Sequence, residues 1–205
     1  MLVSTAPQES LALDFHPVTS DRWPDVVRLF EHHGNPGYCW CMRWRATSRE
    51  FQRLGKEGRG LSLEALVRSG VPTGVLAYRD GEPIAWCSVA PRETYEALER
   101  SRVLRRLDDA STWSVVCFFV DRRFRRRNVT AGLLQAAVAY ARSHNAEIIE
   151  GYPVEPEAAS YRFMGGVTIF QKAGFRDATA GGQRRKTMRY FVDEEMSLSA
   201  SSAST

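Results

Sequence analysis

An apolar stretch, a run of arginines and an amphipathic stretch follow one another in the middle of the chain. Residues Trp113–Val120 are mostly apolar, which predicts a strand buried on both faces of a sheet. Five arginines then fall within Arg122–Arg127, interrupted only by Phe124. In Thr130–Arg142 apolar residues recur at helical spacing. A strand, a basic loop and a helix in this order predict a phosphate site, because the first N–H groups of a helix have no partner within it.

The other segments predict one α/β domain without internal repeats. Asp80-Gly81 between two strand-like runs is a strong hairpin signal, and Thr47 followed by Glu50 fits a capping box that begins a helix. Gly34 and Gly174 are each placed to end a helix. The order is β-α-α-α-β-β-α-β-α-β-α-β. Strands are expected at 11–16, 75–79, 83–89, 113–120, 146–152 and 186–192, and helices at 21–33, from 47 to a break at 55–60, at 62–69, 94–107, 130–142 and 161–173.

Length and composition indicate a protein with a single globular domain. The chain has 205 residues, of which 43% are hydrophobic and 25% charged, enough for one domain with a sizeable core. Residues 1–10 and 193–205 are expected to be flexible tails around a domain at 11–192. No apolar run reaches the length of a membrane span, and the N-terminus lacks a signal pattern. We therefore expect a soluble, cytoplasmic protein without a membrane partner.

The arginine run alone is compatible with any polyanionic ligand, and the sequence around it favours some classes of ligand over others. The net charge is only +4, so the excess is local. Aromatic residues do not interleave with the run as a base-stacking platform requires, and no helix-turn-helix or zinc-finger pattern surrounds it. We therefore expect a compact ligand such as a pyrophosphate rather than a nucleic acid. A nucleic-acid-binding module stays open as an alternative.

The cysteines do not complete a zinc set. Cys39 and Cys41 form a C-x-C pair, and Cys87 and Cys117 stand alone. The pair His32-His33 lies close by, so a metal site is conceivable, but buried apolar thiols are the favoured interpretation. We expect no metal and no disulfide.

Two segments resemble motifs of the GNAT N-acetyltransferases. In that family an Arg/Gln-x-x-Gly-x-Gly/Ala segment joins the fourth strand to the next helix, and Arg125–Thr130 resembles it with Asn128 and Thr130 in place of small residues. Asn tolerates the left-handed backbone that the turn needs. Ile169–Phe175 is similar to the family element Leu-Tyr-Glu-Lys-x-Gly-Phe. Phe170 replaces its tyrosine, so the acid role of that tyrosine is not carried over.

The resemblance extends over nearly the whole chain, from Leu11 to Val192. Cys39–Arg45, Ala85–Arg92 and Trp113–Val120 together look like a little-characterised bacterial subgroup of the family. The resemblance implies a mixed sheet of about six to seven strands, splayed between its fourth and fifth strands, with helices on both faces.

The resemblance also implies acetyl-CoA as the acyl donor. The pantetheine arm would lie in the splay, and backbone groups near Phe118–Val120 would polarise the thioester carbonyl. The residues expected to bind the cofactor are Phe118, Phe119, Val120, Arg125, Arg126, Arg127, Asn128, Val129, Thr130 and Phe170.

The acceptor side is less defined by the sequence. The acceptor amine must be neutral to attack the thioester, so a base is needed. Glu150 on the fifth strand is the nearest candidate carboxylate, and the alternative is that it is a glutamate at the sheet edge in solvent. Tyr152 and Tyr161 compete for the acid role, with core packing as the alternative. The acceptor wall is expected at 35–45, unless its aromatic residues only cover the core. The predicted acceptor-binding residues are Trp40, Trp44, Arg45 and Arg92.

Taken together, the residues and the resemblance predict an acetyl-CoA-dependent N-acetyltransferase. Its expected acceptor is a primary amine of a small molecule, and it is expected to act as a monomer or homodimer. A protein lysine or N-terminal amine is the nearest alternative acceptor. A CoA-binding regulator without turnover is the alternative from another class, because Phe170 and the lack of a carboxylate on the fourth strand weaken the catalytic reading.

Overall fold

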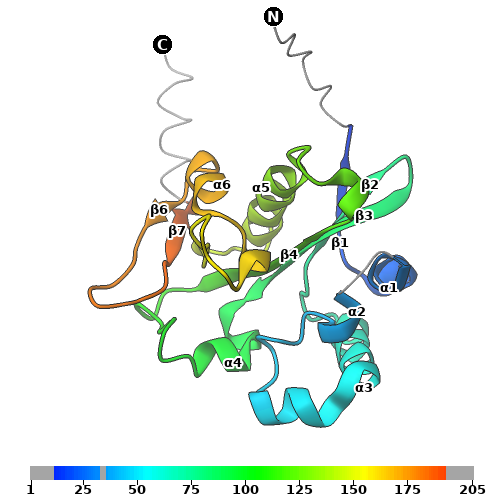
Figure 1. Cartoon of the computed structure of the whole chain (residues 1–205), viewed down its shortest axis with the longest axis horizontal. Helices are drawn as coiled ribbons and strands as arrows, with labels where there is room; N and C mark the ends of the chain where they lie inside the picture. Colours follow the sequence, from blue (N-terminus) through cyan, green and yellow to red (C-terminus); the bar gives the residue numbers. More distant parts are fainter. Residues whose placement is uncertain (1–11, 33–35, 193–205) are drawn as a thin grey trace, which may run out of the picture.

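A mixed sheet organises the chain, as Figure 1 shows. The computed structural model describes residues 12–32 and 36–192. The seven strands lie in the order β1-β2-β3-β4-β5-β7-β6, and β4–β5 is the parallel pair among them. This confirms the predicted mixed α/β sheet. The strands are β1 (Asp14–Pro17), β2 (Val75–Arg79), β3 (Glu82–Pro91), β4 (Thr112–Val120), β5 (Ile148–Gly151), β6 (Arg176–Asp177) and β7 (Met188–Phe191).

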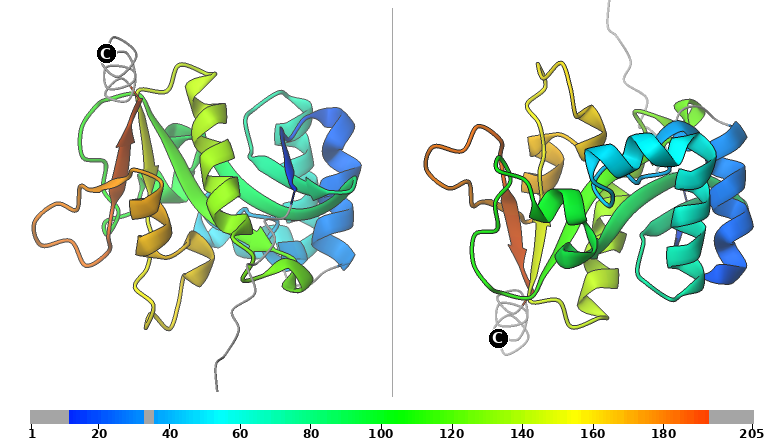
Figure 2. Two further views of the ribbon diagram at one scale, coloured as in Figure 1. Left: turned by 90° about the horizontal axis from the view of Figure 1, so that it is seen from above. Right: turned by 90° about the horizontal axis from the view of Figure 1, so that it is seen from below.

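Helices cover both faces of the sheet, as the two views of Figure 2 show. Helices α5 and α6 cover one face, and α1, α3 and α4 lie on the other. Strand β3 serves both sides, since Ala85 and Cys87 pack towards α5 while Trp86 packs towards α1. The helices are α1 (Trp23–His32), α2 (Pro36–Cys39), α3 (Ser48–Arg68), α4 (Glu96–Glu99), α5 (Val129–Arg142) and α6 (Val167–Lys172).

Strands β4 and β5 separate after four paired residues. Their pairing ends at Val115 and Gly151, although β4 continues to Val120. At the same point β4 bulges against β3, because Ser88 pairs with Cys117 and Val89 with Val115, which leaves Val116 as an extra residue. A bulge bends and twists its strand. The predicted splay between the fourth and fifth strands is therefore present, and the bulge lies where it begins.

The structure confirms the hairpin turn, the helix cap and the helix break that the sequence predicts. Asp80 and Gly81 both have positive φ, 49° and 77°, as the tight hairpin turn between β2 and β3 requires. The Thr47 hydroxyl accepts a hydrogen bond from the Glu50 N–H at 3.3 Å and caps α3. Gly55 kinks α3 at φ 61° and ψ −172°, so the predicted break is real but short.

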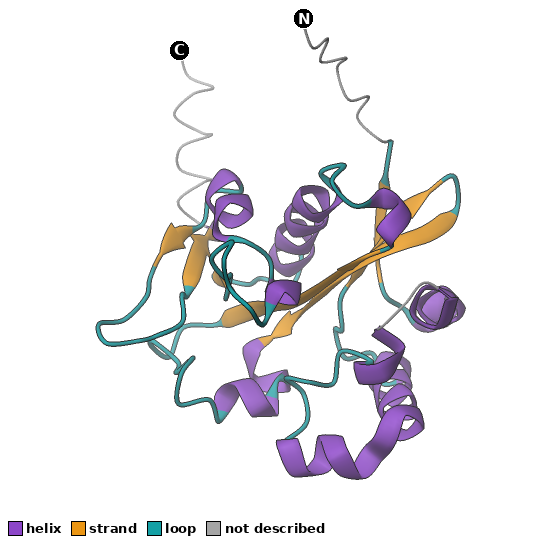
Figure 3. Cartoon of the chain, viewed as in Figure 1, coloured by secondary structure: helices purple, strands orange, loops and turns teal. Residues whose placement is uncertain are grey.

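Two predicted helices are wrong in extent. The helix expected at 94–107 contains only α4, and Figure 3 shows a long loop from there to β4. Tertiary contacts hold this loop, because Leu104 is buried and its carbonyl accepts from the Arg92 guanidinium. The helix expected at 161–173 begins only at Val167, since Gly165 adopts φ 86°, which an α-helix cannot include.

Other boundaries shift by a few residues. The first strand begins at Asp14, so the described residues 12 and 13 of the predicted 11–16 lie outside it, and β5 is shorter than the predicted 146–152. The short strand β6 was not predicted. The expected tails, His33 and the predicted stop at Gly34 lie outside the described residues. No described helix has both the length and the apolar character needed to cross a membrane.

Candidate active site

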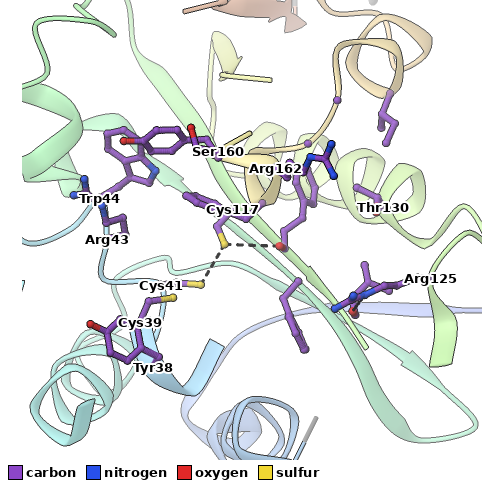
Figure 4. Close-up of a pocket in the computed structure, with 18 of the residues that line it drawn as sticks. Tyr38, Cys39, Cys41, Arg43, Trp44, Cys117, Arg125, Thr130, Ser160 and Arg162 are labelled. Carbon is purple, nitrogen blue, oxygen red and sulfur yellow. Dashed lines mark hydrogen bonds between the residues drawn. The ribbon is translucent and has the colours of Figure 1, made fainter. Parts of the chain in front are cut away.

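A cavity of about 1000 Å³ opens beside the free end of β4. One side, here called the cofactor arm, is lined by Val120, Arg125, Thr130, Gly166 and Ile169. The opposite side, the acceptor arm, is lined by Tyr38, Cys39, Arg43, Trp44, Phe51 and Tyr161. Figure 4 shows Cys117 between them, with Arg125 and Thr130 to one side and Arg43 and Trp44 to the other. The splay therefore leads into a single two-sided cavity.

The N-terminus of α5 forms the polar end of the cofactor arm. Asn128 precedes the helix in the left-handed conformation, with φ 58°, and its side chain does not cap the helix. Its amide therefore leaves the first N–H groups of α5 open to a ligand. A smaller cavity of about 230 Å³ lies here, lined in part by Arg125, Arg126, Asn128, Val129 and Thr130. Uncapped N–H groups beside a guanidinium suit a pyrophosphate.

The unpaired edge of β4 supplies the other part of the cofactor arm. Phe118, Phe119 and Val120 line the cavity, beyond the last pairing with β5 at Val115. Backbone groups on such an edge can hydrogen-bond to an extended ligand as a neighbouring strand would. The residues present therefore fit acetyl-CoA. The strand edge suits its extended pantetheine chain, and the helix N-terminus suits its phosphates. Arg127 is exposed but lines neither of these two cavities.

Phe170 lies behind the cavity rather than in its wall. Its side chain is fully buried, with its ring centroid 6.1 Å from that of Phe118 on β4 and 5.0 Å from that of Phe175. On the other side it meets β5, where a Cβ added to Gly151 would lie 2.0 Å from the ring. Phe170 therefore fills the wedge between the diverging strands. Its direct contact with the cofactor stays a prediction.

One of the four residues predicted for the acceptor wall, Trp44, lines the acceptor arm. Trp40 is instead buried against Trp23, with ring centroids 5.8 Å apart. Arg45 is buried as well, and its guanidinium lies 4.4 Å from the centroid of the Tyr95 ring. Their role in acceptor binding stays a prediction, and their packing indicates that they support the wall from behind.

Arg92 and Glu150 belong to a buried ion cluster that does not line the cavity. One carboxylate oxygen of Glu150 accepts from Arg92 at 2.8 Å and from the Tyr152 hydroxyl at 2.7 Å. The other accepts from Arg189 at 2.8 Å. Burial raises the pKa of Tyr152 well above its ordinary value. The base role of Glu150 stays a prediction, but two arginines already hold its charge in place.

Three thiols line the cavity. Cys39 and Cys41 lie within the acceptor wall predicted at 35–45, and Cys117 on β4 was not assigned to the site. The Cys41 and Cys117 sulfurs are 3.7 Å apart, as Figure 4 shows, and Cys39 lies beside them. A hydrogen bond with Cys117 raises the pKa of Cys41, and one with Cys41 raises that of Cys39. Both thiols are therefore neutral near pH 7. The described residues contain no cluster that could hold a metal ion, and His33 lies outside them.

The other residues of the acceptor arm are Tyr38 in α2, Arg43 in the segment that joins α2 to α3, and Phe51 in α3. Tyr38 and Arg43 lie within the acceptor wall predicted at 35–45, whereas Phe51 was missed. The available signal was an aperiodic aromatic segment between two helices. Trp40 and Cys41 in this segment have positive φ, 46° and 52°. Such strained backbone is concentrated at functional sites in proteins.

Comparison with known proteins identifies the fold and the family. Residues 39–165 match the acetyltransferase (GNAT) family model. The polyamine N-acetyltransferase of Drosophila melanogaster has 14% identity and a TM-score of 0.55, over 88% of this chain and 100% of that one. YncA, a putative acetyltransferase of Salmonella typhimurium solved with acetyl-CoA, has 13% identity and a TM-score of 0.53, over 89% and 95%.

A third similar structure also contains the cofactor. The PaiA N-acetyltransferase of Thermoplasma acidophilum, in complex with coenzyme A, has 10% identity and a TM-score of 0.51, over 89% of this chain and 100% of that one. No curated protein matches the sequence. At these identities the solved structures support the fold, while the family model covers more than half of the chain. With the family come acetyl-CoA as cosubstrate and N-acetyl transfer as reaction: this chain belongs to the GNAT acetyltransferase family.

Proposed function

We propose that this enzyme transfers an acetyl group from acetyl-CoA to a primary amine of a small molecule, by direct attack on the thioester. The observation that carries the proposal is the single cavity whose cofactor arm and acceptor arm meet at Cys117. Such a cavity brings two bound reactants together, which removes much of the entropic barrier to their reaction. A binding protein without turnover has no need of the second arm.

The cofactor arm would bind and orient the donor. Acetyl-CoA supplies an activated acyl group whose carbonyl gains negative charge as an amine attacks. Arg125 and the first N–H groups of α5 would hold its phosphates. Free backbone N–H groups on the edge of β4 between Phe118 and Val120 would stabilise the developing charge on the carbonyl oxygen.

The acceptor arm would favour the neutral form of the amine. Its lining is largely aromatic, and Arg43 adds a positive charge. Loss of solvation and a nearby positive charge both lower the pKa of an ammonium group. The cavity therefore promotes deprotonation without a carboxylate in its wall, and water can carry the proton away. Tyr161 lines the cavity, whereas Tyr152 is enclosed in the ion cluster, so Tyr161 is the better choice to protonate the departing thiolate.

The experiment is a thiol-release assay with acetyl-CoA and a panel of small primary amines. We expect thiol release that depends on the amine, with the acetylated amine identified by mass spectrometry. The matched variant is Trp44→Ala, which should lower kcat/KM for the amine and leave the KM for acetyl-CoA nearly unchanged. Acetylation of peptides but of no small amine would contradict the proposed acceptor. Stabilisation by CoA without any turnover would contradict the enzyme and favour a regulator.

A further inference from the structure

We infer that the acceptor arm recognises an amine that carries a carboxylate on an aromatic or apolar body, and that Arg43 binds this carboxylate. The inference rests on the proposed function and names the acceptor class for that site. Its first support is the charge of the cavity wall. Among the residues that the structure describes, the charged ones that line the cavity are Arg43, Arg125 and Arg162, and none of them is an aspartate or glutamate. A polycationic acceptor such as a polyamine would meet only charges of its own sign.

Of these three arginines, Arg43 is the one left to bind the acceptor, because the other two have other roles. Arg125 lies on the cofactor arm, at the start of α5. Arg162 donates from Nε to the Ala158 carbonyl and from Nη2 to the Pro156 carbonyl, both at 3.0 Å, so its own loop holds it. Arg43 is half-buried on the acceptor arm, and its guanidinium lies 5.6 Å from the centroid of the Trp44 ring.

No carboxylate in the described part of the chain forms an ion pair with Arg43, in contrast to the buried Arg92 and Arg189. Arg92 and Arg189 each have acidic partners, and Arg45 has oxygen acceptors from Thr94 and Pro72. A half-buried guanidinium beside an aromatic ring retains a fork of donors that matches a carboxylate. The site is therefore prepared for an anionic group that the residues in 12–32 and 36–192 do not supply.

Trp44 gives a second, independent indication of a ligand. Its side chain is only 7% exposed, and its indole N–H is buried without a hydrogen-bond partner in the described structure. An unpaired buried donor lowers stability, and an oxygen of a ligand would satisfy it. The Trp44 ring also faces that of Tyr161, with centroids 6.1 Å apart and planes inclined by 32°. These flat walls suit an aromatic or apolar body between the amine and the carboxylate.

The test compares amines that differ only by a carboxylate. The pairs are phenylalanine with phenethylamine, tryptophan with tryptamine, and leucine with isopentylamine, and spermidine serves as the polycation. We expect kcat/KM at least about tenfold higher for the carboxylated member of the best pair, with spermidine poorest. Arg43→Gln should bring the ratio within that pair close to one. Arg43→Lys should restore part of it, because it keeps the charge and loses the fork.

The matched control is Arg49→Gln, an exposed arginine at the start of α3 that does not line the cavity, and it should leave the ratio unchanged. Spermidine as the best acceptor, or a ratio that Arg43→Gln does not alter, would overturn the inference and leave the proposed function intact. Calorimetry with CoA present measures acceptor binding without turnover. Binding of the carboxylated amine that depends on Arg43, without acetylation, would support the inference while refuting the proposed function. Absence of both binding and turnover for every carboxylated amine would overturn the inference.

Discussion

Arg92 and Arg125 carry the same guanidinium group, but one is buried and the other is exposed to solvent. Arg92 is fully buried and hydrogen-bonded to Glu99, Glu150 and Leu104, whereas Arg125 is exposed at the mouth of the cavity. Removal of the first would leave buried acceptors and a carboxylate without their partner, so it would destabilise the fold. Removal of the second would take away an exposed charge and one exposed hydrogen bond, from Arg125 Nε to the Val120 carbonyl at 3.0 Å, so the fold should lose little stability. Residue type alone therefore does not separate a structural arginine from a ligand-binding one.

Arg125→Ala should weaken acetyl-CoA binding by about 10- to 100-fold, the usual worth of a hydrogen bond to a charged group. The side chain lines both the large cavity and the smaller one at the start of α5. The melting temperature of the free protein should hardly change, because Arg125 is exposed. Isothermal titration calorimetry measures the dissociation constant, and Arg122→Ala in the same loop is the control, since Arg122 is exposed and lines neither cavity. Equal affinities of the two variants would refute this role of Arg125.

At the scale of elements, the strand, the basic loop and the helix were predictable, and the bulge that shapes the site was not. The stretch 113–120 is mostly apolar, so it shows which element forms but not which residue faces which side. The extra residue Val116 leaves no mark in such a pattern. Likewise the pattern does not show that the backbone of Gly165 interrupts the helix predicted at 161–173. Phe170 matches a core position, and the pattern does not show that it separates two strands.

The wedge between β4 and β5 predicts that Gly151→Ala is destabilising. The new Cβ would lie 2.0 Å from the Phe170 ring, which must shift within a packed core. We expect a loss of about 1–3 kcal/mol in the free energy of unfolding, measured by urea denaturation, and a higher KM for acetyl-CoA. Adding Phe170→Leu should recover part of the loss, because the two residues share one space.

The control for this change is Gly181→Ala, where an added Cβ meets nothing within 4 Å and φ is not positive. It should leave stability within about 0.5 kcal/mol of the parent. A Gly151→Ala protein as stable as the Gly181→Ala protein would mean that Phe170 does not hold the strands apart.

Across the whole molecule, the buried ion cluster joins segments that no local pattern connects. Arg92 follows β3, Glu150 lies on β5 and Arg189 on β7, and Arg189 also binds Asp108 in the loop before β4. Arg92 and Glu150 are 58 residues apart, and Asp108 and Arg189 are 81 apart. The part of the cofactor arm from Val120 to Thr130 could be predicted because its residues lie close together in the sequence. The part of the acceptor arm within 35–45 was predicted as well, whereas Phe51 and this cluster were not, because tertiary contacts bring them into place.

The same cluster predicts how stability depends on pH. A hydrogen bond from Arg189 holds the pKa of Asp108 below its ordinary value of 3.8. A carboxyl whose pKa is lower in the folded state stabilises the fold above its unfolded pKa, and this stability is lost as pH falls through the folded pKa. Asp108→Asn should therefore lower the free energy of unfolding at pH 7 and pH 5, and the difference from the parent should shrink as pH falls below 3.8.

The effect should reach no more than about 1 kcal/mol, because the Asp108 side chain is 46% exposed and water screens its charge. Urea denaturation at pH 7, 5, 4 and 3 measures it. Asp109→Asn is the control. Asp109 is exposed and follows Asp108 in the sequence, so its substitution changes the net charge equally and leaves the contact between Asp108 and Arg189 in place. If the Asp108→Asn and Asp109→Asn curves run parallel from pH 7 to pH 3, the pairing with Arg189 does not stabilise the loop. A curve that converges with the parent only for Asp108→Asn would show that the cluster anchors this loop to β7 through an ionised carboxylate.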